Sequence, residues 1–95
     1  MIKHIVMYKL KDSTKENALQ LQQAFLSMKG KIEQVVSLEA GVDILNSERS
    51  FDVVLECTFK NLEDMSAYKK HPVHLPVQKY VHSVIEKSQS VDYEF

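Results

Sequence analysis

Two stretches of alternating apolar and polar residues, joined by a short polar segment, restrict the fold of this chain more than any other feature. In residues 36–44 and again in residues 51–59, every second side chain is apolar. A period of two is that of a β-strand with one buried face. The polar segment 46–50 is short, so the sequence predicts a β-hairpin. The side chains expected on its buried face are Val36, Leu38, Ala40, Val42, Ile44, Phe51, Val53, Leu55, Cys57 and Phe59.

The N-terminal part of the chain predicts a strand followed by a helix. Residues 1–10 alternate, which places His4, Val6 and Tyr8 on one face and leaves the other face partly apolar as well. Ser13 and Glu16 form a capping-box pattern, in which the hydroxyl accepts from the amide three residues on. We expect the helix to extend to about residue 28, with Gly30 as its stop.

The C-terminal part predicts two helical segments and a closing strand. Asn61 is a typical N-cap, and the helix that it starts should turn Leu62 and Met65 inward and end before Pro72. Pro76 suits the first turn of a further helix, because a missing amide hydrogen is harmless there. Residues 85–93 then form the last strand. The apolar side chains expected to share one face of it are Ile85, Val91 and Tyr93.

The order of elements is β-α-β-β-α-β, which is the ferredoxin-like pattern of an α+β domain. Residues 1–95 make a single domain with a four-stranded antiparallel sheet and helices on one face. The other sheet face is expected to be open and apolar, with Val6 and Tyr8 among its side chains. Because an exposed apolar sheet promotes aggregation, we expect two copies to pair through this face as a homodimer.

Composition excludes several classes of function. The formal net charge is −1 and no long basic run occurs, so we expect no nucleic-acid partner. No apolar run approaches the about 18 residues of a membrane span, and the first ten residues are too polar for a signal peptide. Cys57 is the only cysteine, which rules out an internal disulfide and a cysteine metal site. These features are typical of a cytoplasmic protein without a membrane partner.

The segment NLEDMSAYKKHPVH, residues 61–74, gathers the residues most suited to chemistry. A neutral His74 imidazole could act as a general base, or it could simply cap the following helix or hydrogen-bond across the turn. Tyr68 could donate to a carbonyl or oxyanion, or it could be a core aromatic residue. His71 precedes Pro72 and could either contact a ligand or fix the turn. No further ligand completes a metal shell with the two histidines, so we expect no metal.

Several quoted segments together resemble one family over nearly the whole chain. These are IKHIVMYKLKD, LEAGVDILNSERSFDVVLECTF, LEDMSAYKKHPVH and VDYEF, with the spacing Y-x-x-H-P-x-H as the most specific part. They are similar to the stress-responsive A/B barrel domain proteins. The resemblance implies ferredoxin-like protomers that pair sheet to sheet into a dimeric α/β barrel. Most members have no assigned reaction, and a minority in plants resemble polyketide cyclases that use no cofactor.

The resemblance also implies roles for individual residues. By motif position, His74 would be the general base, Tyr68 would hold the substrate carbonyl and His4 would line the pocket. The candidate substrate-binding residues are His4, Val6, Tyr8, Phe25 and His71. Phe25 is the only aromatic residue expected on the first helix, whereas cyclase-like members have more.

Three hypotheses for function follow, of which the third is a pure interaction module that uses its surface helices. In the first, the chain is a small dimeric barrel protein of unassigned activity that binds a small apolar or aromatic molecule. In the second, it is a cofactor-independent enzyme, such as a cyclase or lyase, with His74 as the base and Tyr68 as the donor. The second hypothesis requires both groups to converge on a cavity of about 300 Å³ or more.

Overall fold

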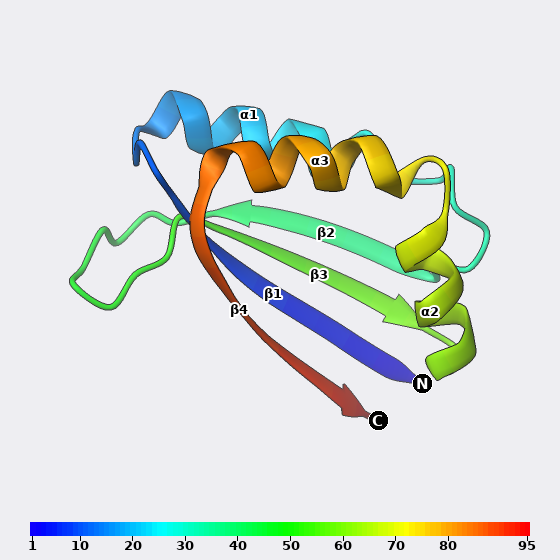
Figure 1. Ribbon diagram of the computed structural model, residues 1–95. Coiled ribbons are helices and arrows are strands. Elements are labelled where there is room, and N and C mark those ends of the chain that lie inside the picture. The colour runs from blue at the N-terminus through cyan, green and yellow to red at the C-terminus, as the bar shows by residue number, and fades with distance from the viewer.

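In the computed structural model, which describes residues 1–95, four strands form one antiparallel sheet, two longer helices lie over one of its faces, and a shorter helix lies at one end of the sheet (Figure 1). The strand order is β2-β3-β1-β4. The predicted ferredoxin-like order is confirmed, with the second helical part divided in two. The elements are β1 Ile2–Leu10, α1 Lys15–Leu26, β2 Ser37–Val42, β3 Val53–Phe59, α2 Leu62–Lys70, α3 His74–Val84 and β4 Ile85–Glu94.

The division between α2 and α3 follows from local signals that the sequence carries. The Asn61 side-chain oxygen accepts from the amide of Asp64 at 2.8 Å, which confirms the predicted N-cap. At the other end, His71 is extended (φ −67°, ψ 138°), as expected for a residue before proline, and α2 stops at Lys70. Pro76 lies in the first turn of α3. Leu62 is 61% exposed, so its predicted inward position is wrong.

The core lies between α1 and the inner face of the sheet. Leu21 and Phe25 of α1 are buried against Leu55, Cys57 and Phe59 of β3. All five have an exposed fraction of 2% or less, so this layer is fully desolvated. Full burial of a side chain of this size stabilises a fold by about 1.5–3 kcal/mol. The prediction that Cys57 is a buried core residue is confirmed.

The hairpin is present but its strands are shorter than predicted. β2 and β3 pair antiparallel only between residues 37–42 and 53–58. Val36 and Ile44 are 49% and 98% exposed, so neither belongs to the buried face. The Asp43 carboxylate accepts from the Asn46 amide at 2.7 Å, and Asn46 has a positive φ of 54°. This turn bends the chain away from the sheet directly after β2.

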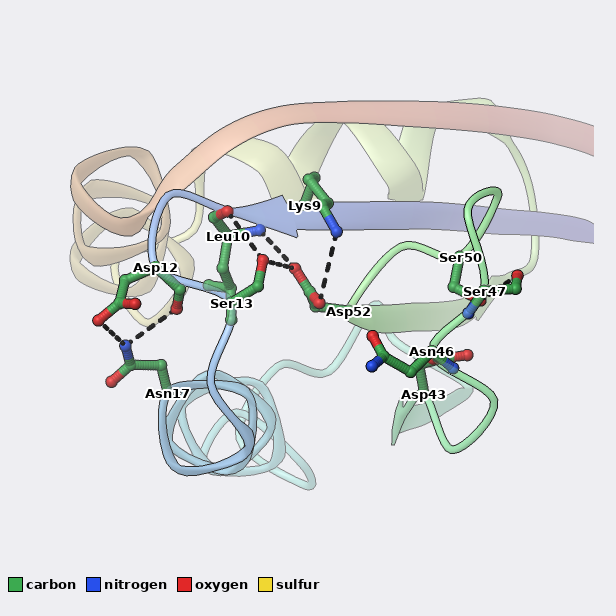
Figure 2. A network of polar contacts seen from close by, with 10 residues as sticks. All are labelled: Lys9, Leu10, Asp12, Ser13, Asn17, Asp43, Asn46, Ser47, Ser50 and Asp52. Carbon is green, nitrogen blue, oxygen red and sulfur yellow. Dashed lines mark hydrogen bonds and ion pairs between the residues drawn. The ribbon is translucent and has the colours of Figure 1, made fainter.

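The first helix starts one residue later than the capping box predicts. Thr14, and not Ser13, is the N-cap, and its hydroxyl accepts from the Asn17 amide at 3.1 Å. The Ser13 hydroxyl is occupied elsewhere: it donates to the Leu10 carbonyl at 3.2 Å and to Asp52 at 2.9 Å (Figure 2). The helix ends at Leu26, short of residue 28.

Asp52, just before β3, ties the end of β1 to the hairpin (Figure 2). Its carboxylate accepts from the buried Leu10 amide at 2.8 Å and from the Ser13 hydroxyl, and Lys9 lies 3.9 Å away. Its own amide donates to the Tyr8 carbonyl at 2.9 Å. We call these residues the Asp52 network. It holds together three segments that are distant in sequence.

The register of β4 differs from the prediction because of a bulge. Val91 and Tyr93 lie opposite Ile5 and Lys3 of β1, but the register shifts between Lys9 and Leu10. An extra residue in one strand reverses the face on which the following side chains lie. Ile85 therefore lies on the inner, helix-covered face, so its predicted place beside Val91 is wrong.

The open face of the sheet is also different from the one expected. Val6 is 8% exposed and lies on the helix-covered face, as does Tyr8, whose ring centroid is 5.0 Å from that of Phe25. The predicted place of Val6 and Tyr8 on the open face is wrong, because β1 turns its odd-numbered residues outward. The apolar side chains of the open face are Ile5, Met7, Val54, Val91 and Tyr93. They lie beside the ion pair of Lys3 and Glu56, at 2.9 Å.

Candidate functional site

A cavity of about 250 Å³ lies between the inner face of the sheet and helices α2 and α3. Five of the residues singled out from the sequence line it, although its volume is slightly below the about 300 Å³ set for the enzyme hypothesis. The complete lining is His4, Tyr8, Phe25, Tyr68, Lys69, His74, Val77, Gln78, Val81, His82, Ile85 and Ser88.

Tyr68 and His74 meet at the break between α2 and α3. Their ring centroids are 4.3 Å apart at an interplanar angle of 44°. Tyr68 is in the last turn of α2 and His74 is the first residue of α3. Because Pro72 ends α2, the chain can turn and place the imidazole of His74 against the phenol of Tyr68. The structure therefore brings together the two residues that the motif singled out.

The hydrogen bond of His74 determines which of its nitrogens can accept a proton. Its Nδ1 lies 3.1 Å from the carbonyl oxygen of Lys69. A carbonyl can only accept, so Nδ1 carries the hydrogen and Nε2 keeps its lone pair. Burial lowers the pKa of His74 below 6.5, although the hydrogen bond to the Lys69 carbonyl acts in the opposite direction. The Lys69 ammonium adds to the lowering, as do the His4 and His71 rings whenever they are protonated. His74 is thus a neutral imidazole near pH 7 with one free basic nitrogen.

Tyr68 has the complementary property of a donor. It is 1% exposed, and burial raises the pKa of its phenol above the ordinary value of 10, with nearby Cys57 acting in the same direction. Burial likewise raises the pKa of the Cys57 thiol to about 12. Both groups keep their protons at physiological pH. Tyr68 therefore remains a hydrogen-bond donor, with the Cys57 sulfur as a partner within its reach, and does not act as an anion.

His4 is held by a residue that sequence reasoning did not single out. Its Nδ1 is paired with the carboxylate of Asp92, which lies opposite it in the β1–β4 register. His4 is 9% exposed, and its Nε2 is the nitrogen left for a ligand in the cavity. Asp92 belongs to the closing VDYEF segment, so pairing the first and last strands would have placed it beside His4.

Two of the predicted substrate-binding residues lie outside the cavity. The Nδ1 of His71 accepts from the Val73 amide at 3.0 Å, and its Nε2 is 3.9 Å from a carboxylate oxygen of Glu33. His71 therefore fixes the turn, which is the alternative that the sequence left open. Val6 is buried between the neighbouring strands, opposite Leu55 and Ser90, and is not part of the lining.

Helix α3 contributes more to the cavity than the motif indicates. His74, Gln78 and His82 all line it, and they are spaced four residues apart. Side chains at that spacing lie on one face of a helix. This polar stripe beside the apolar stripe of Val77 and Val81 was the signal available in the sequence.

Tyr8 and Phe25 both line the cavity and pack against each other, with ring centroids 5.0 Å apart. The chain has no group of three or more His, Cys, Asp or Glu side chains placed to hold a metal ion. The helices are also too short or too polar for any one of them to cross a membrane. The chemistry available at this site is hydrogen bonding and proton transfer.

Comparisons with known proteins place this geometry in a family. The sequence model of the stress-responsive A/B barrel domain matches residues 2–95. A dimeric ferredoxin-like protein of unknown function from Bacteroides fragilis is 31% identical, with a TM-score of 0.84, and the match covers 99% of this chain and 95% of that chain. A comparison with curated proteins finds no match.

More distant structures share the fold alone. A dimeric ferredoxin-like protein of unknown function from Thermobifida fusca is 17% identical, with a TM-score of 0.86 over 99% of this chain and 90% of that chain. A hydroxynitrile lyase from Passiflora edulis is 18% identical, with a TM-score of 0.80 over 97% and 90%.

Proposed function

Because this chain belongs to the stress-responsive A/B barrel domain family, we propose that it is a homodimeric protein that binds a small molecule in the cavity of each protomer. The ligand is aromatic or otherwise largely apolar and carries a carbonyl or hydroxyl group. The observation that carries the proposal is the convergence of Tyr68 and His74 on a cavity that the packed rings of Tyr8 and Phe25 also line. An apolar cavity with a few convergent polar groups is typical of a ligand site.

The size of the cavity limits the ligand. Sites for drug-sized molecules have volumes of about 300–1,000 Å³, and this cavity has about 250 Å³. A single substituted ring fits this volume better than an extended polyketide chain.

A thermal-shift experiment with acetophenone tests ligand binding. Acetophenone offers one ring and one carbonyl, so it should raise the melting temperature of the wild-type protein. Tyr68→Phe removes the donor and should abolish most of that increase. Tyr80→Phe, which removes a phenol hydroxyl outside the cavity, is the matched control and should respond like wild type. An increase that is the same in Tyr68→Phe and wild type would contradict binding at this site.

The dimer is supported by the apolar side chains of the open sheet face and by the dimeric state of the B. fragilis relative. Ile5 lies in the middle of that face, opposite Val91 and Glu56. Sedimentation velocity should give twice the protomer mass for wild type and a monomer for Ile5→Glu, because a charge would be buried at the interface. Leu19→Glu, on the exposed side of α1, should remain dimeric. A wild-type monomer at micromolar concentration would refute the dimer.

A second candidate function is proton transfer on the bound molecule. It is favoured by the tautomer of His74, whose free Nε2 can remove a proton from an acidic C–H group while Tyr68 donates to the developing oxyanion. Deuterium incorporation into a 1,3-diketone, followed by NMR, measures this step. Wild type should accelerate exchange, and both His74→Gln and Tyr68→Phe should lower the rate by about 10²-fold or more. Equal rates for His74→Gln and wild type would exclude His74 as the base.

A further inference from the structure

The cavity is lined by four basic side chains and by no carboxylate. Lys69 from α2, His74 and His82 from α3 and His4 from β1 all line it, and no Asp or Glu does. The carboxylate of Asp92 is paired with the Nδ1 of His4, and Asp92 is not part of the lining. The surface presented to a ligand therefore carries donors and positive charge and no carboxylate.

Lys69 is placed where its charge acts on the ligand site. Its backbone carbonyl accepts from His74 Nδ1, so its side chain begins beside the Tyr68–His74 pair. No ion pair to an acidic residue holds Lys69, whereas Lys3 and Lys9 each have an acidic partner. Lys69 and Lys70 are both exposed, but only Lys69 lines the cavity.

We propose that the ligand of this cavity is a small carboxylate and that Lys69 is the residue that selects for its charge. This inference rests on the ligand-binding function proposed above and adds the charge class of the ligand to it. The carboxylate accepts from the Lys69 ammonium and from donors within the cavity, while the ring or chain that bears it lies against Tyr8 and Phe25.

The electrostatics around His74 agree with an anionic occupant. The Lys69 ammonium disfavours the protonated form of His74, and the His4 and His71 rings act in the same direction whenever they are protonated. A bound carboxylate would offset these charges in a partly desolvated site, where the interaction between unit charges is stronger than in water. Hydrogen bonds to a charged partner are also stronger than those between neutral groups.

Calorimetric titration with benzoate and benzamide at pH 7 tests the charge class. The two probes have the same ring and nearly the same size, but only benzoate carries a charge. Benzoate should bind wild type about tenfold or more tightly than benzamide, as expected for one charge-assisted hydrogen bond. Lys69→Met should weaken benzoate binding about tenfold and leave benzamide unchanged. Lys70→Met, a matched charge removal outside the cavity, should change neither.

The other outcomes separate this inference from the proposed function. Equal affinities of wild type for the two probes would overturn the charge selection while leaving a ligand site in place. If Lys69→Met weakened both probes equally, its role would be structural, and the inference would again fail. Absence of binding for benzoate, benzamide and acetophenone would overturn the ligand site and the inference together.

Discussion

Replacement of Asp52 by alanine should be among the most destabilising single changes to an exposed loop of this protein. The Asp52 carboxylate accepts from the Leu10 amide at 2.8 Å and from the Ser13 hydroxyl at 2.9 Å, and it lies 3.9 Å from the Lys9 ammonium. Leu10 is 2% exposed, so water cannot easily replace the lost acceptor at its amide. The three interactions therefore contribute unequally.

The magnitude can be worked from these partners. The buried amide bound to a charged group contributes about 1.5–3 kcal/mol, the exposed Ser13 hydroxyl about 0.5–1 kcal/mol and the long Lys9 contact close to zero. We expect Asp52→Ala to lower the free energy of unfolding by about 3 kcal/mol. For a domain of this size, that corresponds to a decrease in melting temperature of about 12–24 °C. Asp52→Asn keeps an oxygen for Leu10 and should lose about half as much.

Urea denaturation followed by circular dichroism, at one fixed protein concentration, measures the loss. Asp43→Ala is the matched control, because Asp43 also accepts from one backbone amide, at 2.7 Å, but within the exposed loop after β2. It should lose about 1 kcal/mol or less. If Asp52→Ala lost no more than Asp43→Ala, the reasoning about the buried Leu10 amide would be refuted.

Three further predictions concern the site and its supports. Burial lowers the pKa of His74 in the folded state, so as the pH falls this histidine is protonated in the unfolded chain before it is protonated in the folded protein. The stability that the neutral ring contributes is therefore complete above about pH 6.5 and is lost as the pH falls. Urea titrations should show a smaller loss of stability between about pH 7 and 5 in His74→Gln than in wild type, and an equal loss would contradict the shift. Since burial raises the pKa of Cys57 to about 12, a disulfide reagent at neutral pH should label it only in urea, and rapid labelling of the native protein would contradict its burial. Asn61→Ala removes the N-cap of α2 and should lower the free energy of unfolding by about 1 kcal/mol. An unchanged urea midpoint would contradict the contribution of this cap.

The parts of the fold that the sequence predicts correctly depend on local signals. The Asn61 cap, the stop at Pro72 and the alternation of β3 each involve residues only a few positions apart. The start of α1 was misplaced because the choice between Ser13 and Thr14 depends on Asp52, which is 39 residues from Ser13. The face of Ile85 was wrong for a similar reason, since the bulge is a property of strand pairing.

The candidate site could be predicted in its centre but not at its edges. The motif placed Tyr68 and His74 together because only the short connection between α2 and α3 separates them. It could not place Asp92 beside His4, since these residues are 88 positions apart and meet only when the first and last strands pair. The volume of the cavity depends on the packing of side chains from several elements, so the sequence gives no direct measure of it.

The break at Pro72 also limits how this site can evolve. One residue inserted into the connection between α2 and α3 would turn the second helix by about 100° about its axis. His74, Gln78 and His82 would all swing away from the ligand, but so would Val81, which is 4% exposed and anchors the helix to the interior. Insertions or deletions in this connection would therefore destabilise the fold. The lining of the cavity can therefore change by exchange of side chains, while the backbone that carries them stays fixed.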